Sequence, residues 1–253
     1  MDSESTATNF HLTRSQTIGY LRDLESVGCD STLYLPAGLT LESVEAHIKA
    51  SIGVSVPHAL ASAAQSSPTG ACLFSSGGLV VVLPPFPVKE IMASKGCEAG
   101  PLIKMIDYDW TIAIVLVRLG AYAVGACRGE RLVASKVGTG LVHSRQRQGG
   151  SSSQRFRRRR EKQIEQFLIR VCEKVRDHLG PLLNDIDFVA YGGARTTIDL
   201  FKKRCTLLSE HNAPELPSLL DIPDPRRPVL EAAVTRVWSS RVFEWKSEDE
   251  ASG

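Results

Sequence analysis

The residues best suited to chemistry lie in one stretch, Arg145–Glu161, with the sequence RQRQGGSSSQRFRRRRE. Gly149 and Gly150 can adopt backbone conformations that are closed to other residues, so a ligand can approach the backbone closely there. The serines that follow are preferred N-cap residues, and they predict a helix that begins near Ser153. The first turn of a helix has unpaired amides and the positive end of the helix dipole, and both attract a phosphate or a developing oxyanion. The stretch therefore predicts an anion-binding loop at a helix start.

Basic residues concentrate in the same region. Residues 131–160 include nine lysines and arginines and no acidic residue, which leaves 21 basic and 28 acidic residues elsewhere. The formal net charge of +2 therefore divides into one cationic segment and a body of net charge −7. Cations at a helix start oppose the helix dipole, so their placement there favours a bound anion over a solvated basic face. We predict nucleic-acid contact through the arginines of this region, Arg145, Arg147, Arg155, Arg157, Arg158, Arg159 and Arg160. Phe156 lies among these arginines, and we expect its side chain to pack.

The spacing of the cysteines and the absence of known catalytic motifs argue against a metal site and against a nucleophilic enzyme. None of the six cysteines lies within twenty residues of another, so the sequence has no zinc pair and no C-x-x-C motif. Several lie in apolar runs, where a reduced cysteine acts as a small hydrophobic side chain, and we expect a cytoplasmic protein. The sequence also lacks a G-x-S-x-G elbow, an HExxH motif and a Walker loop. We expect no metal and no cofactor.

The sequence around the basic stretch predicts the strands and helices that position it. Residues 110–118, 121–127 and 131–137 are apolar and separated by tight turns, which is typical of an antiparallel meander. A long helix to about Leu179 follows, and then a strand at 187–191 and a helix at 196–205. The order βββαβα predicts an α/β domain in which helices pack on one mixed sheet, a layered arrangement of the ribonuclease H-like type.

The first hundred residues predict a smaller α/β segment. Helices are expected at 13–27, 41–52 and 59–65, and strands at 32–35, 71–74 and 79–83. This part contains no convergent set of catalytic residue types. Its charge-free stretch at 50–88 contains five prolines, which exclude a membrane span. We expect an N-terminal segment at 1–105, whose packing within the same domain is left open, a catalytic domain at 106–245 and a frayed acidic tail at 246–253.

Here the sequence resembles a known family. Three strands, a basic loop with two glycines and an arginine-rich helix are similar to the catalytic domain of eukaryotic and archaeal peptide-chain release factors. In those factors a Gly-Gly-Gln loop opens a helix that begins Ser-Ala-Leu-Arg-Phe-Ala-Arg. Gly149–Gly150 matches the two glycines, and Arg155–Phe156 matches the Arg-Phe element. Gln148–Gly149–Gly150–Ser151 further resembles the loop of the Vms-like release factors, which are peptidyl-tRNA hydrolases of ribosome quality control; a bacterial branch is expected.

The family glutamine has no direct counterpart. Aligned on the glycines, Ser151 takes the release-factor glutamine position and Ser152 takes the Vms-like one. Gln154 is the first glutamine after the glycines, and we favour it as the functional residue over Gln148, which precedes them. The predicted catalytic set is thus Gln154, Gly149, Gly150, Ser151 and Ser152.

The resemblance implies a function and a set of partners. It implies hydrolysis of the ester of peptidyl-tRNA by water, with loop amides stabilising the oxyanion and the glutamine positioning the water. The implied partners are peptidyl-tRNA and the peptidyl-transferase centre of the large ribosomal subunit. We expect a monomer without membrane attachment that acts in ribosome rescue or quality control.

Three alternatives remain open. A tRNA- or ribosome-binding module without hydrolytic activity would need only the arginines. A metal-dependent nuclease of ribonuclease H type could use the aspartates near strand and helix ends, Asp107, Asp109, Asp187 and Asp199. A serine hydrolase could use Ser151, Ser152 or Ser153 with His143, although a histidine in a basic loop more often contacts RNA or solvent.

Overall fold

The computed structural model describes residues 8–53, 56–142, 153–211 and 213–246. The chain divides into two compact units, and each is described by itself. Unit 1 consists of residues 1–108 and 235–253, and unit 2 of residues 109–234. No helix in the described ranges is both long enough and apolar enough to cross a membrane.

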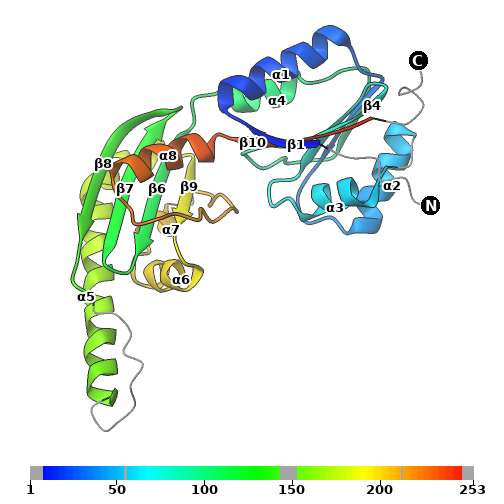
Figure 1. Cartoon of the computed structure of the whole chain (residues 1–253). Coiled ribbons are helices and arrows are strands. Elements are labelled where there is room, and N and C mark those ends of the chain that lie inside the picture. The colour runs from blue at the N-terminus through cyan, green and yellow to red at the C-terminus, as the bar shows by residue number, and fades with distance from the viewer. Residues whose placement is uncertain (1–7, 54–55, 143–152, 212, 247–253) are drawn as a thin grey trace. The chain divides into compact units, whose positions relative to one another are not determined.

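Unit 1 is built on a six-stranded sheet in which all neighbouring strands are antiparallel. In spatial order the strands are β1 (Thr8–Leu12), β10 (Ser240–Lys246), β4 (Gly78–Leu83), β3 (Ala71–Ser75), β2 (Ser31–Leu35) and β5 (Met92–Lys95). The last described strand of the chain therefore lies between the first strand and β4 (Figure 1).

Helices cover both faces of this sheet. Alternate residues of β2 point to opposite faces, so Leu33 and Leu35 belong to one core and Tyr34 to the other. The first core is closed by α2 (Leu41–Ile52) and α3 (His58–Ser66). The second is closed by α1 (Arg14–Val27) and α4 (Gly100–Asp107). Because both faces are covered, β2 is buried along its whole length.

The start of α1 is a capping box formed by Thr13 and Gln16. The backbone N–H of Thr13 donates to Oε1 of Gln16 at 3.0 Å. Gly28 follows the helix with a φ of 86°, and its N–H donates to the Leu24 carbonyl at 2.9 Å. Local chemistry thus determines both ends of this helix.

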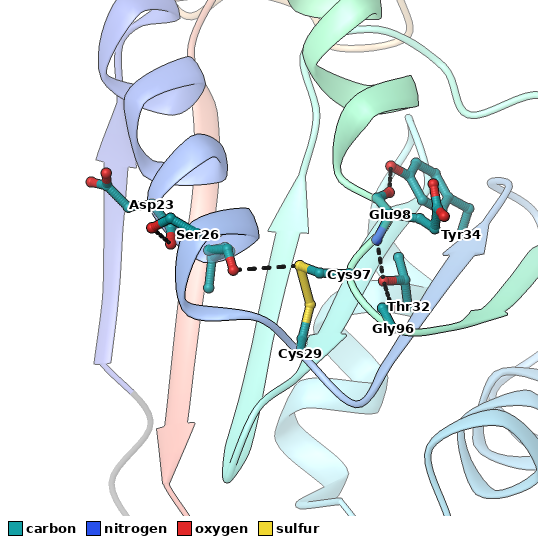
Figure 2. The surroundings of a disulfide bond; sticks show 9 residues. Asp23, Ser26, Cys29, Thr32, Tyr34, Gly96, Cys97 and Glu98 are labelled. Carbon is teal, nitrogen blue, oxygen red and sulfur yellow. Dashed lines mark hydrogen bonds between the residues drawn. A yellow bond between two sulfur atoms is a disulfide. The ribbon is translucent and has the colours of Figure 1, made fainter.

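A disulfide joins Cys29, after α1, to Cys97, before α4 (Figure 2). The Cα atoms are 4.7 Å apart although the residues are separated by 68 positions. The segment around Cys97 is also fixed by β2: the Thr32 hydroxyl donates to the Gly96 carbonyl at 2.8 Å, and the Glu98 N–H donates to the same hydroxyl at 3.0 Å. The expectation of reduced cysteines is wrong for this pair, because the tertiary fold brings distant residues together.

Unit 2 contains a four-stranded mixed sheet. In spatial order the strands are β8 (Arg131–Thr139), β7 (Ala121–Arg128), β6 (Thr111–Arg118) and β9 (Phe188–Gly192). The first three form the predicted antiparallel meander, and β9 pairs with β6 in parallel. Short parallel bridges extend the edge at β9, joining Val189 to Glu215 and Gly192 to Leu220.

The helices of unit 2 lie on both faces of its sheet. They are α5 (Ser153–Leu179), the 3-10 helix η1 (Gly180–Asp185), α6 (Arg195–Arg204), α7 (Leu207–Glu210) and α8 (Arg227–Val237), whose last turn crosses into unit 1. Val124 and Ala126 of β7 face the core that α5 and α6 close. Gly125 lies between them and points to the opposite face, where a Cβ would be 3.1 Å from Leu230 of α8.

The mixed α/β class is confirmed, while the ribonuclease H-like type of layering stays a prediction. The expected second domain at 106–245 differs from the compact unit at 109–234. The difference arises because β10 pairs with β1 and β4 of unit 1. The sequence pattern predicted no strand at β10, and it did not predict β1, β5, α4 or α7 either.

Candidate nucleic-acid interface

The predicted helix start is the N-terminal end of α5. This helix has 27 residues and is therefore about 40 Å long. Its C-terminal part packs on the sheet, where Phe167, Leu168 and Val171 are buried. By contrast, residues 154–159 are all exposed. Figure 1 shows α5 continuing well past the ends of the strands.

Gly140 marks the place where the sheet ends against α5. This glycine follows β8, and a Cβ built on it would lie 2.6 Å from the ring of Phe167 and 3.0 Å from Nη2 of Arg170. The α5 residues before Ile164 therefore extend beyond the end of β8. We call residues 154–163 the α5 arm. At 1.5 Å per residue the arm is about 15 Å long.

The α5 arm brings the predicted glutamine together with the arginines. Gln154 lies in the first turn of α5 and is exposed. Arg155 and Arg157 to Arg159 are exposed as well, and Arg160 is half-buried. Nε of Arg157 lies 3.7 Å from Oε1 of Glu161, but both side chains are more than 60% exposed, so solvent screens this ion pair. The arm is thus the N-terminal end of a helix that carries a cluster of arginines, as the sequence predicted.

The other predicted site residues fall outside the described ranges. These are Arg145, Arg147, Gly149, Gly150, Ser151 and Ser152, together with Gln148 and His143 of the alternative assignments. Their roles stay predictions. The helix that follows them begins at Ser153, which confirms the predicted helix start.

Two bonds join the part of α5 that follows the arm to the C-terminal end of α6. A disulfide joins Cys172 of α5 to Cys205, directly after α6, with Cα atoms 5.4 Å apart. An ion pair joins Oε1 of Glu165 to Nη1 of Arg204 at 2.9 Å. This disulfide again corrects the expectation of reduced cysteines. Cys72 and Cys127 are buried thiols outside both disulfides, and burial raises the pKa of the Cys72 thiol above its usual range.

Phe156 does not pack as expected, because its side chain is 49% exposed. It follows the same helical spacing as the buried residues of α5, which explains the expectation. The sheet, however, ends near Gly140, and the sequence pattern does not predict where it ends. The helical periodicity could have predicted that Phe156 is exposed only if the end of β8 had been known.

The aspartates of the nuclease alternative lie on different elements of the fold. Asp187 accepts a hydrogen bond from the Thr111 N–H on Oδ2 at 2.8 Å, and Asp107 ends α4 in unit 1. Asp199 lies on α6. Within the described part of the chain, no group of three or more His, Cys, Asp or Glu side chains is arranged to hold a metal ion.

A pocket of about 300 Å³ lies between α6 and residues 215–219. Its lining has two basic and two acidic side chains, so their charges balance. Nζ of Lys202 bonds to Oε2 of Glu215 and also lies 4.4 Å from the centre of the Tyr191 ring. Burial and the Glu215 carboxylate raise the pKa of Tyr191 above its ordinary value, so its phenol stays protonated. Balanced charges make this pocket a poorer anion site than the α5 arm.

The chain is similar to archaeal release factors in sequence. Peptide chain release factor subunit 1 of Picrophilus torridus is 25% identical over 134 residues, which are 51% of this chain and 32% of that protein. The same subunit of Archaeoglobus fulgidus is 28% identical over 117 residues, which are 46% of this chain and 29% of that protein. The chain thus spans about a third of the length of these relatives.

Solved structures give weaker likenesses. The archaeal translation termination factor aRF1 has a TM-score of 0.38 and 18% identity, covering 89% of this chain and 73% of that chain. Pelota of Archaeoglobus fulgidus has a TM-score of 0.28 and 9% identity, covering 94% and 66%. Likenesses of this size support no conclusion about this chain.

A family model settles the relationship. The model described as Actinobacteria/chloroflexi VLRF1 release factor matches residues 110–243, which include β6 to β9, α5 and the predicted glycine loop. This match confirms the resemblance to release factors that the sequence predicted. Because it covers more than half of the 253 residues, the chain belongs to the Actinobacteria/chloroflexi VLRF1 release factor family, acVLRF1.

Proposed function

We propose that this chain is a ribosome-associated peptidyl-tRNA hydrolase that acts in ribosome rescue or quality control. One observation carries the proposal: the exposed cationic arm of α5, with Gln154 in its first turn, comes three serines after Gly149 and Gly150 in the sequence. Membership of a release factor family supports the same reading. The proposed partners are peptidyl-tRNA and the peptidyl-transferase centre of the large ribosomal subunit.

The proposed reaction is hydrolysis of the ester between the nascent peptide and the terminal ribose of tRNA. Water attacks the carbonyl carbon and the bond from that carbon to the ribose oxygen breaks. One proton of the water ends on the ribose oxygen, the other passes to solvent, and the peptide leaves as a carboxylate. Backbone amides from Gly149 to Gln154 stabilise the oxyanion of the tetrahedral intermediate. The Gln154 amide offers both an acceptor and donors, so it can position the attacking water.

The charge of the arm supports binding to RNA. Five arginines between residues 155 and 160 surround a helix end that already has a positive dipole. In the free protein these arginines repel one another and the positive helix end, whereas bound phosphates make the same charges favourable. The ribosome would therefore provide both the binding partner and the remaining walls of the reaction site.

The test is peptide release from stalled ribosomal complexes by the purified protein. Gln154→Ala should lower the release rate at least about 100-fold, a typical loss for one positioned transition-state group. Its stability should stay within about 0.5 kcal/mol of the parent, since Gln154 is exposed. Gln166→Ala is the matched control, because Gln166 is another exposed glutamine of α5. Equal release by the parent and Gln154→Ala would remove Gln154 from the mechanism.

A binding module without hydrolytic activity is the second candidate. The observation that favours it is Ser151, which occupies the place of the release-factor glutamine after the two glycines. The same experiment separates the two candidates. Ribosome binding without peptide release by the parent protein would establish the binding module and reject the hydrolase.

A further inference from the structure

Phe156 is an aromatic side chain that the fold leaves in solvent. Of the eight phenylalanines, it is the single exposed one in the part of the chain that the structure describes. Helix formation does not require it, since leucine, arginine or glutamine would favour the helix more. An exposed phenylalanine forgoes the free energy of burial. The position therefore calls for a partner that covers the ring.

The orientation of the ring follows from helical spacing. Phe156, Arg160, Gln163 and Phe167 succeed one another at intervals of four, three and four residues, so they lie along one face of α5. This face is buried by the sheet at Phe167, which is 1% exposed. The sheet ends beside Gly140, so the face continues along the α5 arm without it.

Charge identifies the partner. Arg155 and Arg157 flank the ring in sequence, and the first acidic residue after the arginines is Glu161. At 100° per residue, the four side chains from Arg157 to Arg160 point in four directions around the helix. This distribution suits a polyanion that surrounds the helix end. Unpaired bases of RNA combine that charge with flat faces on which phenylalanine rings and guanidinium planes stack.

We infer that Phe156 stacks on an unpaired base of RNA while the arginines of the α5 arm contact the phosphates. The inference rests on the proposed function for the identity of that RNA, but stacking itself needs only a single strand. Arginines supply affinity that falls with salt, whereas the ring supplies affinity that depends on a free base face. The two contributions can therefore be measured separately.

The experiment measures the affinity of the full chain for a single-stranded RNA oligonucleotide and for the duplex of the same sequence, across a salt series. Phe156→Ala should weaken binding to the single strand roughly 5- to 150-fold, the range of one base–aromatic stack. Phe156→Leu should weaken it similarly, because leucine retains apolar area but has no flat face. Phe156→Trp should bind as tightly as the parent. The salt slope should not change in any of these variants.

Two controls make the result specific. Ile169→Ala removes an apolar α5 side chain of similar exposure, 45%, outside the arm, and it should bind both RNAs like the parent. Duplex RNA offers no free base face, so its affinity should hardly change in the Phe156 variants. Equal losses on single strand and duplex, or parent-like binding by Phe156→Leu, would overturn the stacking. So would a lower melting temperature of Phe156→Ala with unchanged RNA affinity, because the chain itself would then cover the ring.

The inference and the proposed function can fail independently. A parent that releases no peptide but shows the Phe156 effect on single strands would reject the hydrolase and support the stacking. A parent that releases peptide while Phe156→Ala binds single-stranded RNA normally would reject the stacking alone.

Discussion

Asp187 and Thr111 bind each other at the point where β6 and β9 begin to run side by side. The Asp187 N–H donates to the Thr111 carbonyl at 2.8 Å, and the Thr111 N–H donates to Oδ2 of Asp187 at 2.8 Å. The side chain thus substitutes for a backbone acceptor at the start of the parallel pair. Asp187 therefore has a structural role at the start of the β6–β9 pair, in place of the metal-binding role of the nuclease alternative.

Asp187→Ala should lower the free energy of unfolding by about 1.5–3 kcal/mol, because the Thr111 N–H loses a charged acceptor. Asp187→Asn should lose less, since its amide oxygen can still accept. Urea unfolding followed by circular dichroism measures both, with the exposed Asp199→Ala as a control near the parent value. Normal stability of Asp187→Ala combined with loss of activity would instead indicate a functional carboxylate.

Neutralising Arg157 to Arg160 should weaken ribosome or tRNA binding and flatten its dependence on salt. The slope should fall by about one for every phosphate that the variant no longer binds, because fewer counterions are released on binding. The melting temperature should hold or rise, since the like charges repel one another and oppose the helix dipole. Affinity across a salt series is the measurement.

Arg176→Gln and Lys203→Gln remove exposed charges elsewhere on α5 and α6 and should leave that slope unchanged. If the arginine variant and these controls have the same slope, the arginines form a solvated face, and a nucleic-acid interface on the α5 arm is rejected.

Gly193→Ala should destabilise unit 2 by at least about 2 kcal/mol. Gly193 has a φ of 127°, and a Cβ there would lie 2.1 Å from the Val117 carbonyl oxygen. Both the backbone conformation and the close approach to β6 therefore require glycine. Thermal unfolding is the measurement, and Gly180→Ala is the matched control because a Cβ at Gly180 meets no atom within 4 Å. Similar melting temperatures for the two variants would contradict this account.

Removing the Cys172–Cys205 disulfide should lower the free energy of unfolding by roughly 4 kcal/mol, the size expected when a cross-link closes a loop of this length. The two residues are 33 positions apart. Urea unfolding with and without a reductant in a Cys29→Ala/Cys97→Ala background isolates this bond. Adding Cys172→Ala and Cys205→Ala to that background should abolish the response to the reductant. If the reductant does not change the unfolding free energy of the Cys29→Ala/Cys97→Ala protein, Cys172 and Cys205 are not joined.

The sequence alone determined the elements whose signals are local. Alternating or continuous apolar runs and tight turns predicted β6, β7 and β8 within a few residues. Serines before an apolar stripe predicted the start of α5, and the arginine run predicted where its charge lies. Each of these signals acts between residues that are close in the chain, so folding of the remainder hardly changes them.

Only the tertiary structure decided the features that depend on distant residues. Strand β10 exists because β1 and β4 provide its partners, and the disulfides join cysteines that are 68 and 33 positions apart. The exposure of Phe156 likewise depends on where the sheet ends beside Gly140, not on the helix that contains it. A helical pattern identifies which side chains share a face, whereas burial of that face requires an opposing surface, and the surface comes from other parts of the chain.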